Sequence, residues 1–234
     1  MNPFYAPKDY PEMLNKIGIF TLAGALVLTW FIAHANAKIG AIVLAGTLKI
    51  PVLGVELPPF FVAPGFLIAL TFRVVRLHDR VSDLLRIRET FDLHEILTPL
   101  AQGVGLATPP PWIRDSLGSR SSLMNKVFYR FAGSSNPKIS QHDITMALDT
   151  WTWFWIIMEL EVVALFSIAL FVFSKAFTHT AIVLGLMGLG LLAMYLLYRS
   201  CAHHAHTEVE LILDDGSRRK EIKAAFDALS NSRL

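Results

Sequence analysis

The sequence is poor in charge. Only 17% of its 234 residues are Asp, Glu, Lys or Arg, and 53% are hydrophobic. Soluble domains carry about 25% charged residues, which keep their surfaces hydrated. The deficit argues against an ordinary soluble enzyme and against a disordered chain. The composition instead indicates a polytopic membrane protein.

Cysteine and net charge are also scarce. Cys201 is the single cysteine, so no intramolecular disulfide can form. The net charge is only +2, which leaves no global basic footprint for a nucleic-acid polymer. We therefore expect no such partner and infer nothing about an oxidising compartment.

Motifs of known catalytic chemistry are missing as well. The chain contains no G-x-S-x-G elbow, no H-E-x-x-H and no C-x-x-C. Gly103-Val104-Gly105 lacks the later glycine or the Lys-Ser/Thr pair of a phosphate-binding loop. We therefore expect no catalytic residue and no cofactor, and an enzyme is the least favoured function class.

What the sequence does contain is four apolar runs. A spanning helix needs about 20 apolar residues, and helices satisfy their own backbone inside lipid. The runs extend over residues 17–37, 60–77, 151–174 and 181–198. The second carries Arg73 and Arg76 near its end, and the third contains Glu159 and Glu161. The sequence predicts an all-α protein with four transmembrane helices.

The first run has an alternative interpretation. Lys16, the apolar stretch after it and Ala35-Asn36-Ala37 resemble a secretory signal with an A-x-A cleavage site. The stretch of 16 residues before it is long and contains Pro3, Pro7, Pro11, Asp9 and Glu12. These features favour an uncleaved membrane helix.

The basic residues predict the orientation. Residues 1–16, the connection 73–150 and the tail from Arg199 together hold 18 of the 21 Lys and Arg residues, which favours the cytoplasm for all three. We therefore divide the chain into a first helix pair with a short outer hairpin (1–77, hairpin 38–59), a cytoplasmic helical domain (78–150), a second helix pair (151–199) and a cytoplasmic helical tail (200–234).

The outer segment 38–59 is apolar but broken by glycine and proline. Residues 48–58 read as two short extended pieces around Leu53-Gly54, and Gly54 can supply the positive φ of a hairpin turn. A hairpin on the outer face is favoured over a re-entrant piece that lines a pathway.

A resemblance rests on the same segment. KIPVLGVELP, followed by VAPGFLIALTFRVVRLHDRV, resembles a hairpin and helix of uncharacterised bacterial multi-pass membrane proteins. It covers 33 residues, from 49 to 81. It implies a place in the bacterial cytoplasmic membrane and carries no function or site residue to this chain.

The connection between the second and third runs is too long for a plain loop. Its apolar residues recur at helical spacing, and the second membrane helix is predicted to continue into it. Ser140 and Asp143 resemble a capping box that starts the third membrane helix. In the tail, two short helices are expected on either side of 214–217. The second has an apolar stripe that needs a partner: Ile222, Ala225, Phe226 and Leu229.

Basic side chains cluster within this connection. From 114 to 138 the chain has five basic residues and one acid: Arg114, Arg120, Lys126, Arg130 and Lys138, with Asp115. Attraction to anionic lipid is the favoured interpretation. A pocket for a small anionic ligand is the alternative.

Glu159 and Glu161 are the most informative residues. A charge inside a membrane span costs a few kcal/mol, about 2.5–3.5 near the centre. Two residues apart on a helix, they point in nearly opposite directions and cannot both face lipid cheaply. Polar packing inside a bundle is favoured over an ion path or oligomer interface. Snorkelling beside an interfacial belt of Trp151, Trp153 and Trp155 is a further option.

Two further groups of residues follow from spacing. Cys201, His203, His204 and His206 lie directly after the fourth run and are weak candidates for part of a metal site. Exposed interfacial histidines are the favoured interpretation. Gly185, Gly188 and Gly190 allow close helix packing, within one subunit or between subunits.

Three function classes remain. The first is a non-catalytic integral membrane component that oligomerises or assembles with partners through its cytoplasmic domain. The second is a channel or pore-forming effector gated by a cytoplasmic anionic ligand or partner. The third is an intramembrane enzyme. The bilayer is the expected environment for all three, and a homo-oligomer or membrane complex is the expected assembly.

Overall fold

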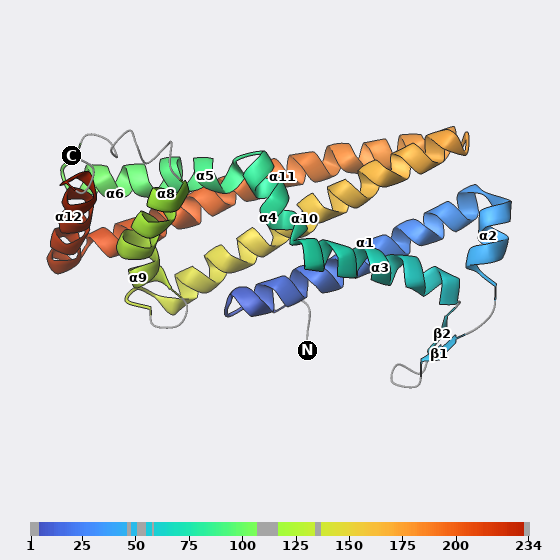
Figure 1. The fold of residues 1–234 in the computed structure, drawn as a ribbon, viewed down its shortest axis with the longest axis horizontal. Helices are drawn as coiled ribbons and strands as arrows, with labels where there is room; N and C mark the ends of the chain where they lie inside the picture. Colours follow the sequence, from blue (N-terminus) through green and yellow to red (C-terminus); the bar gives the residue numbers. More distant parts are fainter. Residues whose placement is uncertain are drawn as a thin grey trace. The chain divides into compact units, whose positions relative to one another are not determined.

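A computed structural model describes residues 5–45, 48–50, 55–57, 59–106, 117–133 and 137–231 (Figure 1). These residues are helical apart from one small hairpin and the connections. The elements in chain order are α1 (Tyr10–Ala35), α2 (Ala37–Val43), β1 (Leu48–Ile50), β2 (Val55–Leu57), α3 (Pro59–Val75), α4 (Leu77–Leu84), α5 (Ile87–Phe91), the π-helix η1 (Asp92–Leu97), α6 (Thr98–Gly103), α8 (Leu117–Met124), the π-helix η2 (Asn125–Tyr129), α9 (Arg130–Ala132), α10 (Gln141–Phe173), α11 (Phe177–Leu213) and α12 (Gly216–Asn231).

Three helices are long and apolar enough to cross a membrane: α1, α10 and α11. A fourth candidate consists of α3 and α4, which are bent by 57° relative to each other. The architecture is therefore compatible with an integral membrane protein of three or four spans. The four predicted runs fall on α1, α3, α10 and α11.

The second predicted helix does not continue straight into the following segment. Arg76, which separates α3 from α4, has a φ of +51°, which ends one helix and redirects the next. The apolar residues that recur at helical spacing after the second run are not all covered, because Leu84 at the end of α4 is 80% exposed and Leu85, the next residue, is 63% exposed. The spacing of apolar residues along the sequence does not reveal that the backbone changes direction between them.

Basic residues take the left-handed conformation at three helix junctions. Among the described residues, Arg76, Arg86 and Lys175 are the non-glycine positions with positive φ. Each lies one or two residues beyond the end of a helix: α3, α4 and α10 respectively. A cation near a helix C-terminus is favourable because it faces the negative end of the helix dipole.

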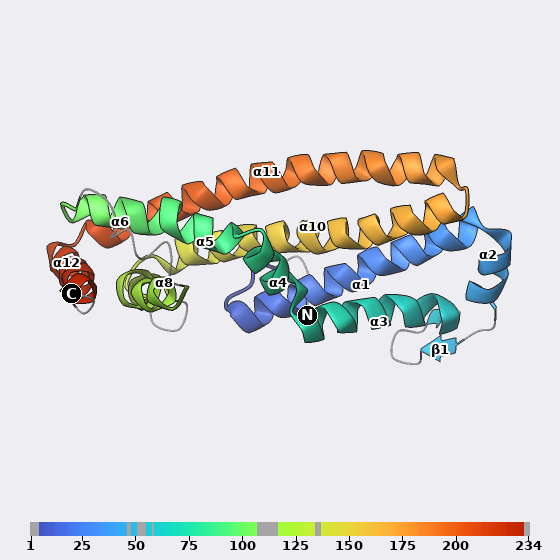
Figure 2. The same ribbon diagram turned by 45° about the horizontal axis from the view of Figure 1, so that its top comes forward.

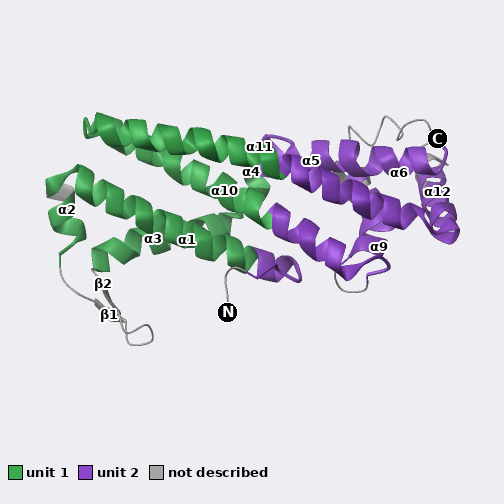
Figure 3. Ribbon diagram, turned by 180° about the vertical axis from the view of Figure 1, so that it is seen from behind, with its two compact units in different colours: residues 1–4, 14–80, 152–197 green, residues 5–13, 81–151, 198–234 purple. Residues whose placement is uncertain are grey.

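The chain divides into two compact units (Figure 3). Unit 1 comprises residues 1–4, 14–80 and 152–197, and unit 2 comprises residues 5–13, 81–151 and 198–234. In unit 1 the helices lie in the order α3, α1, α10, α11 (Figure 2). Small residues allow these approaches: a side chain at Gly65 of α3 would meet Leu26 of α1, and one at Gly24 of α1 would meet Leu160 of α10.

Unit 2 has its own hydrophobic core. Phe226 and Ile222 of α12 are buried in it, so the predicted apolar stripe of the tail packs on the central connection. Leu229 lies outside the described side chains. The other buried core residues come from α5, η1, α6, α8, η2, α9 and α11: Phe91, Ile96, Leu97, Leu100, Ala101, Leu123, Met124, Val127, Phe128, Phe131, Ala132, Cys201, Ala205, Val209 and Ile212.

The tail departs from the prediction in one respect. Residues 199–213 are not a separate short helix, because α11 continues through them without a break. The expected break at 214–217 is present. There Asp215 Oδ1 accepts hydrogen bonds from the backbone amides of Ser217 at 2.7 Å and Arg218 at 3.3 Å, which caps the start of α12.

Two further sequence predictions agree with the described backbone. β1 and β2 pair antiparallel, with Leu48 opposite Leu57 and Ile50 opposite Val55, as a hairpin requires. The turn residues between the strands, including Gly54, lie outside the described residues. The helix predicted to start after Ser140 begins at Gln141.

Candidate functional site

A carboxylate is buried among three helices of unit 1. Glu159 of α10 is 3% exposed and accepts a hydrogen bond of 2.6 Å from Thr21 Oγ1 of α1. Its second oxygen, Oε1, lies 3.5 Å from Nδ1 of His78 at the start of α4. Burying a carboxylate without partners is costly, so these two contacts make its position tolerable. The prediction of a polar role inside the bundle fits Glu159.

His78 faces a second carboxylate. Its Nε2 lies 3.7 Å from Oδ1 of the neighbouring Asp79, while its own side chain is only 5% exposed. Asp79 Oδ2 pairs with the guanidinium of Arg76 at 2.5 Å, and the Arg76 side chain is 63% exposed. A row of polar groups, which we call the polar chain, therefore runs from Arg76 through Asp79, His78 and Glu159 to Thr21.

Tryptophans pack around this row instead of forming only an interfacial belt. Trp155 is 3% exposed, and its ring centroid lies 6.3 Å from that of His78. Lys16 of α1 is 5% exposed, with its ammonium 4.6 Å from the ring centroid of Trp153. The proposed lipid-interface role is therefore wrong for Trp155, which fills the interior beside the histidine.

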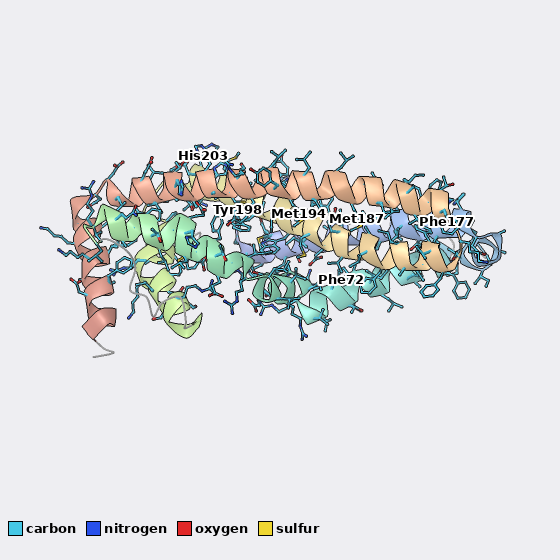
Figure 4. The ribbon with its side chains drawn as sticks, turned by 90° about the horizontal axis from the view of Figure 1, so that it is seen from above. Phe72, Phe177, Met187, Met194, Tyr198 and His203 are labelled. Atoms are coloured by element: carbon cyan, nitrogen blue, oxygen red, sulfur yellow. The ribbon has the colours of Figure 1, made fainter. Side chains whose placement is uncertain are left out.

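Glu161 lies on a different side of α10. Its carboxylate occupies the space that a side chain at Gly190 of α11 would need. Oε2 of Glu161 is buried and has no hydrogen-bond partner among the described residues. Met187 and Met194 are half-buried and lie one helical turn on either side of Gly190 (Figure 4). Glu161 therefore sits at the packing interface between α10 and α11.

The three candidate glycines do not act together. At Gly190 of α11, side chains of α10 approach closely: a Cβ built there would meet Glu161. No described atom lies within 4 Å of a Cβ built on Gly185 or Gly188, and both glycines are exposed. The described residues of the chain therefore supply no close neighbour at these two glycines.

The basic cluster of the central connection is not one surface. Arg120 is 9% exposed and donates from Nη1 to Asp92 Oδ2 at 3.0 Å, so it is unavailable to lipid. Arg130 pairs with Glu221 of α12 at 3.0 Å. Lys126 and Lys138 are exposed, and Arg114 lies outside the described residues. The sequence pattern could not separate the interior cation from the exposed ones.

Asp92 and Arg120 form a buried ion pair in unit 2. Asp92 starts the π-helix η1, and such helical irregularities are frequent at functional sites. Burial raises the pKa of Asp92 from 3.8 to about 6, although Arg120 and Arg88 both lower it. Nε of Arg120 is buried without a hydrogen-bond partner among the described atoms. The pair holds two segments of the core together by charge.

The cysteine and histidines do not converge. Cys201 and Ala205 belong to the hydrophobic core, whereas His203 and His206 are exposed. His206 Nε2 lies 2.9 Å from Glu95. Within the described ranges, no group of three or more His, Cys, Asp or Glu side chains is placed to hold a metal ion. The metal interpretation therefore gains no support.

Sequence reasoning missed His78, Asp79 and Thr21. A single histidine at the end of an apolar run is a weak signal, and threonine gives none. The Thr21–Glu159 hydrogen bond joins residues 138 positions apart, which no local pattern reports. The charges of Arg76 and Asp79, at the end of the second run, were the one sequence signal that polar groups gather here.

The chain belongs to the YmfE protein family, whose model matches residues 9–228. This match covers both compact units and shows kinship without assigning a function. No curated protein and no solved structure matches the chain.

Proposed function

We propose that this member of the YmfE protein family is a non-catalytic integral component of the bacterial cytoplasmic membrane that self-associates. Its apolar helices cross the bilayer, and both termini and unit 2 lie in the cytoplasm. The positive-inside distribution of basic residues supports this orientation. Assembly with further partners takes place through unit 2, which has a hydrophobic core of its own.

The exposure of α11 carries the proposal of self-association. Only 11% of its most apolar 18-residue stretch is buried within the chain, against 28% for α1 and 33% for α10. Gly185 and Gly188 lie on this bare side of the helix and have no described neighbour. Small residues allow a second helix to approach closely, which is how helices associate in lipid. We assign the bare side of α11 to a second copy of the chain.

Bulky substitutions on α11 test this assignment. The Gly185→Leu/Gly188→Leu variant keeps the helix apolar, so membrane insertion is preserved, but it prevents close approach. The Gly185→Ala/Gly188→Ala variant is the matched control because it keeps both side chains small. Crosslinking in membranes and particle mass in detergent are the measurements. We expect oligomers for wild type and the alanine variant and monomers for the leucine variant. A monomeric wild type would contradict the proposal.

A second candidate function is a channel or pore-forming effector. Glu159 and Glu161 place two carboxylates in a candidate span, and one buried oxygen of Glu161 has no described partner. Carboxylates that face water stabilise cations in a narrow passage. Cation flux into liposomes that is abolished by Glu161→Gln would favour this function. Assembly without flux would favour the first.

Exposed cations of unit 2 also suggest a contact with anionic lipid. Unlike Arg120, which is buried against Asp92, Lys126 and Lys138 lie at the surface. Charge reversal at both should weaken binding of the protein to anionic liposomes and reduce its salt dependence. Unchanged binding would leave these lysines as ordinary solvated surface.

A further inference from the structure

We propose that Glu159 is a proton-accepting site in the membrane-embedded part of the protein, loaded from the Asp79 end through His78. This inference rests on the proposed membrane insertion. It adds a ligand, the proton, that self-association does not require. The polar chain from Arg76 to Thr21 carries the argument.

The first observation is that His78 lies between two carboxylates, one at each ring nitrogen. Nδ1 is 3.5 Å from Glu159 and Nε2 is 3.7 Å from Asp79. An imidazole with both nitrogens engaged can take a proton on one side and release another on the opposite side. Both separations exceed a normal hydrogen-bond length, so a small movement of the side chains brings each pair of atoms to about 3 Å before a proton passes.

The second observation is a gradient of exposure along the polar chain. The side chain of Arg76 is 63% exposed, that of Asp79 16%, that of His78 5% and that of Glu159 4%. Protons therefore have an entrance at Asp79 and an end point at Glu159. Beyond it, Thr21 is fully buried and donates to the other carboxylate oxygen, which leaves Oε1 as the atom that faces the histidine.

The transfer conserves protons at every step. Asp79, protonated from solvent, gives its proton to Nε2 of His78 as Nδ1 releases its proton to Oε1 of Glu159. Asp79 ends ionised, Glu159 ends neutral, and the imidazole keeps one proton in the other tautomer. The reverse transfer, from Glu159 Oε1 to Nδ1 and from Nε2 to Asp79, restores the starting arrangement.

Charged groups on each neighbouring element are compatible with this path. From α1, Lys16 lies over the ring of Trp153. From α3, Arg73 donates to Asn15 of α1 at 2.9 Å. Arg76 pairs with Oδ2 of Asp79, whereas the other oxygen, Oδ1, faces His78. On α10, Glu161 points to Gly190 and not to His78.

Infrared titration of the full chain in lipid vesicles tests the site. Buried carboxyls give protonated-carboxyl bands whose intensity follows pH, and the component that belongs to Glu159 should be present in wild type and lost in Glu159→Gln. Gln keeps the size of the side chain and an acceptor for Thr21. Glu161→Gln is the matched control and should keep the Glu159 component. A band in Glu159→Gln that equals the wild-type band at every pH overturns the inference, whereas a weaker residual band is expected from other buried carboxyls such as Asp92.

A pH jump followed by the same band tests the route. Replacement of His78 with Gln should slow the loading of Glu159 by about a hundredfold, the lower end of what a positioned proton-transfer group supplies. Asp79→Asn should slow loading as well, and it leaves the buried residues untouched. Wild-type rates in both variants would overturn the route.

Alkaline extraction of membranes separates the two proposals. A protein that washes off the membrane overturns the membrane assignment and this inference with it. A protein that stays in the membrane but shows no Glu159 band overturns this inference alone.

Discussion

The carboxylate of Glu161 fills the position beside α11 that a side chain at Gly190 would occupy. The two residues belong to neighbouring helices of unit 1, so their fit sets how closely α10 approaches α11. We expect Gly190→Ala to destabilise unit 1 by about 1–3 kcal/mol, the usual cost of overpacking. Gly185→Ala is the control, because no described atom lies near its Cβ position.

Thermal unfolding of the detergent-solubilised protein measures this effect. The double variant Gly190→Ala/Glu161→Ala removes the obstacle and should recover part of the loss. Equal stability of Gly190→Ala and Gly185→Ala would show that Glu161 adjusts its conformation without cost.

The ion pair between Asp92 and Arg120 should be more sensitive to the loss of one partner than of both. Arg120→Met leaves a buried carboxylate without its cation and should cost about 3–5 kcal/mol. The double variant Arg120→Met/Asp92→Leu removes both charges and should lose less. Chemical denaturation followed at a tryptophan of unit 2, Trp151, is the measurement. A double variant as unstable as Arg120→Met would mean that packing, not charge, determines the loss.

Asp92 should also make the stability of unit 2 depend on pH. Its pKa is about 6 in the folded protein and near 3.8 when exposed, so the folded state binds more protons between these values. Stability from this group therefore rises as the pH falls from above 6 towards 4 and is lost again as the pH rises through 6. Denaturation over this range, with Asp92→Asn as the comparison, measures the effect. A wild-type pH profile that matches that of Asp92→Asn would exclude Asp92 as its source.

Both termini are expected on the cytoplasmic side, because 18 of the 21 basic residues lie in the segments that we place there. Reporter fusions that are active only in the cytoplasm should work at either end of the chain. A fusion at 176, between α10 and α11, should be inactive. Activity at 176 with silence at both ends would invert the topology.

The sequence predicted the long helices because hydropathy is a property of consecutive residues. The apolar runs that begin at Ile17 and Trp151 fall within α1 and α10, with errors of a few residues at their ends. The burial of Phe226 was also predictable, since a helical stripe of apolar residues needs a partner. These features depend on local periodicity alone.

Other features depend on contacts between distant residues or on backbone geometry. The sequence does not distinguish Arg120 from a surface arginine, because its partner Asp92 lies 28 positions away. Likewise, Glu159 could be recognised as costly in lipid, but Thr21 and His78 could not be assigned to it. The bend at Arg76 follows from a single φ angle, for which arginine gives no warning.

The basic residues with left-handed backbone conformation at the helix junctions are positions where glycine can replace a charged side chain. Glycine adopts this conformation without strain, whereas for other residues the conformation costs about 1–2 kcal/mol of free energy. Against this, the cation contributes about 0.3–1 kcal/mol at the helix end. The relief of strain equals or exceeds the lost cation contribution at Arg86 and Lys175, which are exposed. Glycine at both positions should therefore be tolerated, and it would supply variants with less surface charge for crystallisation.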